Sequence, residues 1–219
     1  MLIIFDCDGV LVDSEPIAAR VLRHYLEDLG YPLIVRAEDH DRFLGFTLQK
    51  VRETLEAETG TDLPADFEDE LRRRDDAAFE TELKVIDGVI ETVRGLTSAY
   101  CIASSGSLVK IRNSLTLTGM LDLFEPHLFS AHDPGIAKGK PAPDLFLFTA
   151  RRMGFAPADC LVIEDSRAGV EAGVAAGMRV LGFTGGGHCG PGHGAVLVAA
   201  GAVSVFNDMT RLPHLIAQS

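Results

Sequence analysis

Short apolar runs recur along the chain, and small, polar or acidic residues follow most of them. A buried parallel strand reads as a continuous apolar run, so these runs predict strands. The expected strands cover residues 2–5, 100–103, 160–163, 179–183 and 203–206, with 127–129 as a further candidate.

Segments with helical periodicity separate these runs. They cover residues 89–96, 108–117, 144–153, 168–176 and 209–217. Strands and helices in alternation form βαβ units, so the sequence predicts an α/β fold with a mostly parallel sheet.

The segment 16–83 breaks this alternation, because it holds helical patterns and no convincing strand. Its first apolar stripe is ended by Gly30 and consists of Ile17, Val21, Leu22, Tyr25, Leu26 and Leu29. Further helical patterns lie near 44–57 and 66–79. We therefore predict a helical cap domain over 16–83, inserted into a sheet domain made of 1–15 and 84–219.

The composition narrows the partners and the compartment. The chain has 219 residues with 20 Lys and Arg against 32 Asp and Glu, a formal net charge of -12. This balance argues against nucleic acids and anionic membranes as partners. The four cysteines form no Cys-x-x-Cys pair, and no apolar stretch is long enough to cross a membrane. We expect a reduced, cytoplasmic protein.

Two acidic residues follow the first predicted strand, Asp6 and Asp8 in Asp-Cys-Asp-Gly. Carboxylates this close repel each other unless a cation lies between them or one carries a proton. One could attack an electrophile while the other donates a proton to the leaving group. The alternative is a turn, in which Asp and Gly are common.

A second acidic pair, Glu164-Asp165, follows the strand 160–163. It could cap the next helix, but two acidic pairs at two strand ends favour a shared site. Three or four converging carboxyl oxygens are the ligands that Mg²⁺ requires. The sequence therefore predicts a magnesium site formed by Asp6, Asp8, Glu164 and Asp165.

Two other segments could bind an anion. Ser104, Ser105 and Gly106 lie between a strand and a helix, where hydroxyl and backbone N–H groups face a phosphate or serve as an ordinary helix cap. Lys140 comes just before a predicted helix and could reach the same phosphate, with Lys138 as a weaker candidate. A solvated loop lysine is the alternative.

The glycine-rich stretch 185–194 contains His188, Cys189 and His193. Their spacing matches no zinc pattern, and the glycines are typical of a loop. We therefore expect no metal there.

Together these motifs resemble the haloacid dehalogenase superfamily, in its phosphatase and phosphomutase branch. The resemblance rests on four segments in order: Asp-Cys-Asp-Gly-Val-Leu-Val-Asp-Ser-Glu at 6–15, Ser104, Gly-Lys-Pro-Ala-Pro-Asp at 139–144, and Ile-Glu-Asp-Ser-Arg-Ala-Gly-Val-Glu-Ala-Gly at 163–173. It covers essentially the whole chain. It implies a Rossmann-like three-layer core with a helical cap.

The resemblance also implies a reaction and its residues. Asp6 would form an aspartyl-phosphate, and Asp8 would protonate the leaving oxygen and then activate water. Mg²⁺ would bind Asp6, the backbone carbonyl of Asp8, and Asp165, with Glu164 close by. Ser104 and Lys140 would hold the phosphoryl oxygens. For its first step Asp8 needs a proton, so we expect nearby carboxylates and desolvation to raise its pKa.

Differences from the subfamilies narrow the activity. Dehalogenases lack the acid at Asp8, and the β-phosphoglucomutases carry a cap histidine where this chain has Ala18 and a cap arginine where it has Leu48. We therefore predict a Mg²⁺-dependent phosphatase of a small phosphorylated metabolite, a sugar phosphate or phosphorylated sugar acid. A sugar phosphomutase is the alternative, and a phosphometabolite-binding protein without turnover is a third reading. By analogy we expect a monomer.

The cap loop Gly45-Phe46-Thr47 is our candidate for reading the substrate, although Phe46 could equally belong to the cap core. Arg42 and Lys50 flank this loop and could contact a second anionic group, or they could form a solvated face.

Overall fold

The computed structural model describes residues 1–31, 43 and 46–217. Its centre is a parallel sheet of six strands in the order β3-β2-β1-β4-β5-β6. The strands are β1 Leu2–Phe5, β2 Ala99–Ser104, β3 Leu128–Ser130, β4 Cys160–Glu164, β5 Arg179–Phe183 and β6 Ser204–Phe206. The predicted α/β class and parallel sheet are confirmed, including the 127–129 candidate as β3.

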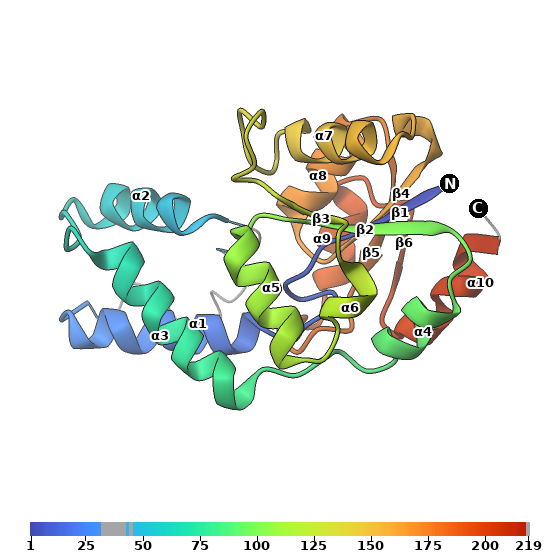
Figure 1. Ribbon diagram of the computed structural model, residues 1–219. Coiled ribbons are helices and arrows are strands. Elements are labelled where there is room, and N and C mark those ends of the chain that lie inside the picture. Colours follow the sequence, from blue (N-terminus) through green and yellow to red (C-terminus); the bar gives the residue numbers. More distant parts are fainter. Residues whose placement is uncertain (32–42, 44–45, 218–219) are drawn as a thin grey trace.

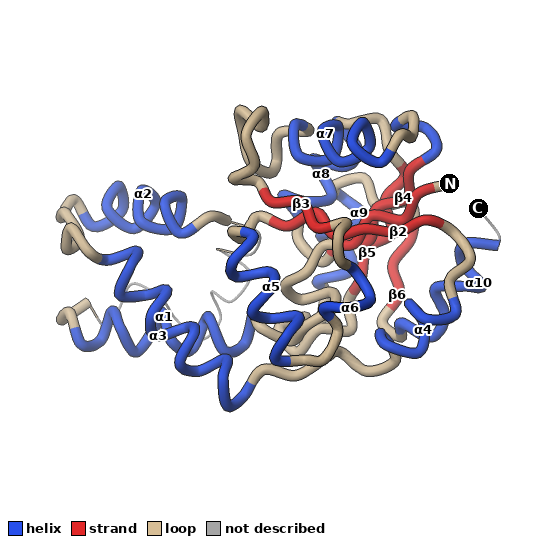
Figure 2. Tube along the Cα trace, viewed as in Figure 1, coloured by secondary structure: helices blue, strands red, loops and turns tan. Residues whose placement is uncertain are grey.

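Helices cover both faces of this sheet (Figures 1 and 2). They are α4 Val89–Gly95, α5 Leu108–Leu117, α6 Leu121–Phe124, α7 Asp144–Met153, α8 Arg167–Ala175, α9 His193–Ala199 and α10 Leu212–Ala217, with short 3-10 turns at Pro157–Asp159 and Met209–Arg211. The predicted helix 209–217 is thus divided into a 3-10 turn and α10. Helices α6 and α9 were not predicted.

Alternate residues of β1 pack on opposite faces, as the two-residue period of a strand requires. Ile3 and Phe5 belong to one hydrophobic cluster, and Leu2 and Ile4 belong to the other. Every residue of β1 is fully buried, which explains why the strand reads as an uninterrupted apolar run.

Three helices between β1 and α4 surround a third hydrophobic cluster. They are α1 Glu15–Asp28, α2 Leu48–Thr59 and α3 Phe67–Glu82. The Tyr25 ring of α1 stacks on Phe67 of α3, with ring centroids 5.2 Å apart. This cluster is built from the predicted stripe of α1, so the helical insert has a small core of its own.

The first strand, β1, lies in the centre of the sheet, and the helical insert follows it in the chain. Its neighbours are β2 on one side and β4 on the other, so the strand order reverses at β1. In Figure 1, β1 runs from the N-terminus toward the three helices of the insert. Ligands of open α/β sheets bind at the carboxyl ends of the strands beside such a reversal, which here face the insert.

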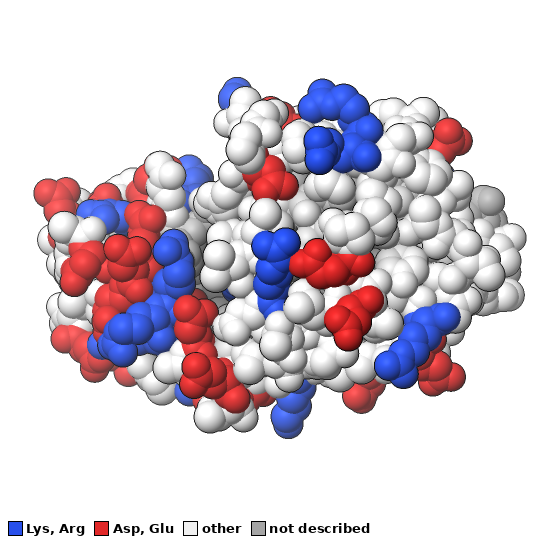
Figure 3. Space-filling view, in the orientation of Figure 1, with Lys and Arg blue, Asp and Glu red and all other residues white. Residues whose placement is uncertain are grey.

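The surface of the insert carries both signs of charge. Red and blue side chains are intermixed over α2 and α3 in Figure 3. Arg73 and Arg74 both pair with Glu70 at 2.7 Å, and Arg52 pairs with Glu56 at 2.9 Å. Among the described residues, no helix is long and apolar enough to cross a membrane.

Candidate active site

Four predicted site residues meet at the carboxyl ends of β1 and β4: Asp6, Lys140, Glu164 and Asp165. Asp6 continues the pairing of these strands, because its N–H donates to the Ile163 carbonyl at 3.0 Å. Lys140 reaches the same place from the loop before α7. Asp6, Glu164 and Asp165 are 7%, 0% and 2% exposed, so this is a buried charged cluster.

The ammonium of Lys140 joins the two acidic pairs. Its Nζ donates to Asp6 Oδ1 at 2.5 Å, to Glu164 Oε1 at 2.6 Å and to the Ala103 carbonyl at 3.2 Å. Burial alone would lower the pKa of Lys140, but Asp6 and Glu164 outweigh it and raise that pKa. Lys140 therefore stays charged, whereas the rival Lys138 is exposed.

The second acidic residue, Glu164, has both carboxyl oxygens engaged. Lys140 takes Oε1, while the Ser166 N–H and hydroxyl both donate to Oε2 at 3.0 Å. Glu164 therefore positions Lys140. Asp6 and Asp165 are the carboxylates better placed to bind a metal.

The residues present fit a hard cation such as Mg²⁺. Carboxyl oxygens of Asp6, Glu164 and Asp165 lie within 4.8 Å of one another. Burial and the neighbouring carboxylates raise the pKa of both Asp6 and Asp165, although Lys140 opposes this shift. Lys140 is one positive charge among three buried carboxyls, so a divalent cation would remove the remaining repulsion.

The other aspartate of the first motif, Asp8, has different partners. The Ser14 hydroxyl donates to its Oδ1 at 2.7 Å, and Lys110 Nζ donates to its Oδ2 at 2.8 Å. Burial acts to raise the pKa of Asp8, but Lys110 and Ser14 outweigh it, and this pKa lies below its usual value. Our expectation of a raised pKa is therefore wrong for this arrangement, because the sequence did not reveal the cation at Lys110.

The predicted anion-binding segment follows β2 directly. Ser104 is almost fully buried, and its Oγ accepts the Gly106 N–H at 3.0 Å. Ser107 is the helix cap instead, since its Oγ accepts the Lys110 N–H at 3.3 Å in the first turn of α5. Ser104, Ser105 and Gly106 thus fold into a tight turn facing the acidic cluster.

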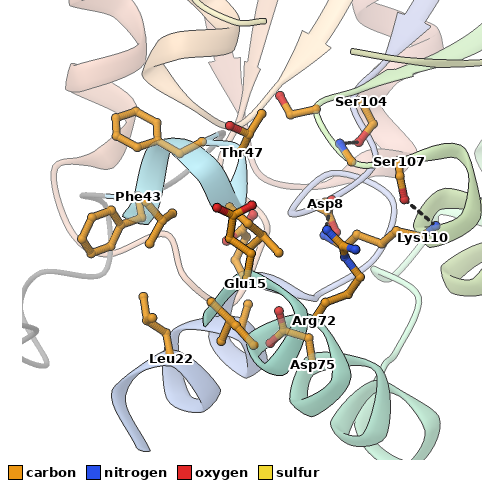
Figure 4. Close-up of a pocket in the computed structure, with 18 of the residues that line it drawn as sticks. Asp8, Glu15, Leu22, Phe43, Thr47, Arg72, Asp75, Ser104, Ser107 and Lys110 are labelled. Carbon is orange, nitrogen blue, oxygen red and sulfur yellow. Dashed lines mark hydrogen bonds and ion pairs between the residues drawn. The ribbon is translucent and has the colours of Figure 1, made fainter. Parts of the chain in front are cut away.

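A cavity of about 490 Å³ connects this cluster with the helical insert. Its floor includes Asp6, Asp8, Asp165 and the turn 104–107, whereas Lys140 and Glu164 are not among its lining residues. Helices α1, α2 and α3 supply the opposite wall, and Figure 4 shows Glu15, Arg72 and Asp75 there. The cavity therefore lies between the sheet domain and the insert.

The predicted cap loop is described only in part. Phe46 and Thr47 line the cavity, and Thr47 also caps α2 by accepting the Lys50 N–H. Gly45 and Arg42 lie outside the described residues. The ammonium of Lys50 lies 3.8 Å from Glu53 on the exposed side of α2, so Lys50 is not a cavity residue.

Several residues of the site were missed from the sequence. Lys110 lies in the first turn of α5, Ser14 lies near the end of the first motif, and Asp75 is one of many charges on α3. His188 also lies here, with Nε2 3.0 Å from Asp165 Oδ2. Only the position of Lys110, six residues after Ser104, gave a usable signal, because a helix that follows the anion-binding turn directs its first turns toward the site.

The fold and this buried acidic cluster define a Rossmann-like α/β hydrolase. The family model for haloacid dehalogenase-like hydrolase matches residues 1–177, and the chain belongs to this family. Among curated proteins, it is 32% identical to 6-phosphogluconate phosphatase of Escherichia coli over 214 residues, which cover 97% of this chain and 93% of that protein.

Solved structures agree. A conserved haloacid dehalogenase-like protein of unknown function from Agrobacterium tumefaciens matches with a TM-score of 0.86 and 43% identity, over 99% of this chain and 97% of the other. A haloacid dehalogenase family hydrolase from Deinococcus radiodurans, with bound phosphate and sodium, matches with a TM-score of 0.78 and 34% identity. The match covers 99% of this chain and 95% of the other. The predicted family and enzyme class, a phosphoric monoester hydrolase, are confirmed.

Proposed function

We propose that this enzyme hydrolyses a small phosphorylated metabolite with Mg²⁺ through an aspartyl-phosphate on Asp6. The observation that carries the proposal is the buried cluster of Asp6, Lys140, Glu164 and Asp165, which meets the floor of the cavity between the sheet and the helical insert. Phosphoryl transfer needs positioning and charge neutralisation more than covalent chemistry from the protein. The buried Asp6 carboxylate is positioned beside the Lys140 ammonium, and the three carboxyls offer a site for a cation. This arrangement supplies both the positioning and the charge neutralisation.

In the first step an Asp6 carboxylate oxygen forms a bond to phosphorus while the ester P–O bond breaks and its electron pair leaves with the alcohol oxygen. In the second step water attacks phosphorus and releases Asp6. Ser104 holds a phosphoryl oxygen, and Lys140, which Glu164 keeps in place beneath the cavity, holds Asp6 through their ion pair. Asp6 and Asp165 would hold Mg²⁺, together with the backbone carbonyl of Asp8 that the family resemblance implies, and the ion would supply positive charge to the phosphoryl oxygens.

Asp8 supplies the proton for the leaving oxygen and takes one from the attacking water. Its ion pair with Lys110 keeps it ionised in the absence of substrate. An incoming phosphate competes for the Lys110 ammonium, since both are anionic partners of the same cation. We propose that this competition frees the Asp8 carboxyl to take up a proton from solvent water before the ester bond breaks.

The wall of the cavity supports a polar, hydroxylated leaving group. Arg23, Arg72 and Asp75 line it together with Gln49. The two arginines could bind a carboxylate of the substrate, and Asp75 and Gln49 could hydrogen-bond to its hydroxyls. A phosphorylated sugar acid carries both kinds of group. The relative named 6-phosphogluconate phosphatase supports this substrate class. A hinged division into 1–15 with 84–219 and a cap of 16–83 would let the substrate enter and exclude water on closure.

Two positions argue against the phosphomutase alternative. Ala18 and Leu48 both line the cavity, so no histidine or arginine faces the substrate from these places. A phosphatase passes the phosphoryl group to water, whereas a mutase must retain it and transfer it to a different hydroxyl of the sugar. Hydrolysis leaves inorganic phosphate, whereas a mutase leaves an isomer, so product analysis separates the two.

The test is a screen of phosphorylated metabolites with Mg²⁺, run on wild type and Asp6→Asn in parallel. We expect inorganic phosphate from a hydroxylated phosphate ester with wild type and none with the variant. Equal phosphate release by both proteins would remove Asp6 from the reaction, and an isomerised phosphate ester as the main product would favour the mutase.

A further inference from the structure

The glycine-rich loop after β5 contacts the predicted metal site from behind. His188 Nε2 lies 3.0 Å from Asp165 Oδ2, and His193 Nε2 lies 2.6 Å from the Asp165 backbone carbonyl. One loop thus touches both the side chain and the main chain of Asp165. No role for this loop was predicted from the sequence, and the four family motifs do not include it.

Two glycines make room for the His188 ring. A Cβ on Gly186 would lie 2.7 Å from His188 Cε1, and a Cβ on Gly9 would lie 2.9 Å from the same atom. Gly9 also has φ +76°, and its Cβ would lie 1.9 Å from Asp165 Oδ2. The ring is therefore held between the first motif and its own loop, with its Nε2 directed at the Asp165 carboxyl.

The loop is also fixed to the first motif and to β6. The Gly187 N–H donates to Asp13 Oδ1 at 2.8 Å, and the Thr184 N–H donates to the Phe206 carbonyl at 2.8 Å. The imidazoles of His188 and His193 are buried, with 8% and 4% of each residue exposed. These contacts fix the loop, so His188 is supported on several sides.

We propose that His188 is a positioning residue for the metal ligand Asp165. With the proton on Nε2, its ring donates to Oδ2 and leaves Oδ1 to face the cation. His193 fixes the peptide of Asp165 in the same way. The proposal rests on the metal role that we propose for Asp165, and it adds a residue outside the family's four motifs.

Metal-ligating carboxylates are commonly oriented by such outer hydrogen bonds, and losing one lowers metal affinity by about 10- to 100-fold. Without His188, the buried Asp165 carboxylate would lose a hydrogen-bond donor, which is costly. His188 does not line the cavity, so these two effects give its buried imidazole a role beside the site.

The three side chains allow a competing reading. Ligand atoms of His188, Cys189 and His193 lie within 4.8 Å of one another, so the loop could bind a soft cation such as Zn²⁺ itself. The hydrogen-bond arrangement is favoured because both histidines face Asp165 at bonding distance. Cys189 separates the two readings, since its Sγ lies 3.2 Å from His188 Nε2 but is not needed to hold Asp165.

The experiment measures the Mg²⁺ dissociation constant by calorimetry on metal-free protein, together with the thermal midpoint of the apo form. His188→Leu keeps the volume without the donor and is expected to weaken Mg²⁺ binding about 10- to 100-fold. His188→Gln restores an N–H near the Nε2 position and is expected to recover most of that loss. Cys189→Ser and the exposed His127→Asn serve as controls, with affinities unchanged within about twofold.

Several outcomes would overturn the proposal. Wild-type Mg²⁺ affinity in His188→Leu, or equal weakening in His188→Leu and His188→Gln, removes the donor role. Tight Zn²⁺ binding by wild type that Cys189→Ser abolishes, with Mg²⁺ binding unaffected by His188→Leu, establishes the soft-metal reading instead. Asp165→Asn tests the underlying function separately: if it binds Mg²⁺ like wild type, the metal assignment fails before His188 is considered.

Discussion

Removing the negative charge of Asp75 on α3 is expected to stabilise the folded protein. Asp75 Oδ1 is buried and has no hydrogen-bond partner among the described residues, and the residue lines the cavity between the sheet and the insert (Figure 4). Burial raises the pKa of Asp75 from 3.8 to about 7, with Lys110 opposing the shift and Asp8 adding to it. The folded protein thus binds a proton that the unfolded chain has already lost.

The sign of the pH effect follows from this difference. Between pH 3.8 and about 7 the folded state holds more protons than the unfolded state, so stability is lost as pH rises through that window. The difference of about three pKa units sets an upper limit of about 4 kcal/mol. Because Asp75 is partly exposed, solvent screening reduces this to roughly 1–3 kcal/mol.

The substitution Asp75→Asn removes the charge and keeps the shape. Above pH 7 it is expected to raise the free energy of unfolding by roughly 1–3 kcal/mol, and the thermal midpoint by roughly 2–12 °C for a chain of this size. Below pH 3.8 the gain should vanish, because Asp75 is then protonated in both states. We also expect KM for a hydroxylated phosphate ester to rise about tenfold, since a lost hydrogen bond to a charged acceptor costs about 1.5 kcal/mol or more.

The assay is thermal and urea unfolding across this pH range at a fixed Mg²⁺ concentration, with steady-state kinetics on the same proteins. Glu80→Gln, an exposed acid on the same helix, is the control for a change of one charge and should shift the midpoint little. A destabilised Asp75→Asn, or a gain that does not depend on pH, would refute the reasoning. An unchanged KM would refute the contact with substrate.

Three further changes test the cluster beneath the cavity. Lys140→Met leaves buried carboxylates without their cation and is expected to lower the unfolding free energy by about 3–5 kcal/mol and abolish turnover; a loss under about 1 kcal/mol would contradict the buried pair. Lys110→Met should raise the pKa of Asp8 and thereby move the acid limb of the kcat–pH profile to higher pH; an unshifted profile would argue against the ion pair. Removal of divalent ions with a chelator should abolish activity and lower the thermal midpoint, both restored by Mg²⁺; full activity in the chelated enzyme would exclude the metal.

Much of the sheet domain could be predicted because its central strands, β1 and β4, are buried on both sides. The run Leu2–Phe5 has no polar residue, and the helices 108–117 and 144–153 match α5 and α7 residue for residue. The first acidic motif and Glu164-Asp165 could be brought together because parallel strands end at one edge.

Other features depend on contacts that sequence spacing does not encode. Lys110 reaches Asp8 across 102 positions of the chain, and this contact reverses the expected direction of the Asp8 pKa. His193 begins α9 where we expected only a loop, and His188 meets Asp165 because two glycines admit its ring. Glu164 was predicted as a metal residue, yet its oxygens are engaged by Lys140 and Ser166.

The most direct test of the central claim is to find where the phosphoryl group goes. Enzyme mixed with a radiolabelled phosphate ester and Mg²⁺, quenched in acid within one turnover and digested, should carry the label on the peptide containing Asp6. The Asp8→Ala variant should accumulate more of it, and Asp6→Asn should carry none. Label on another peptide, or phosphate release by Asp6→Asn at the wild-type rate, would contradict an aspartyl-phosphate on Asp6.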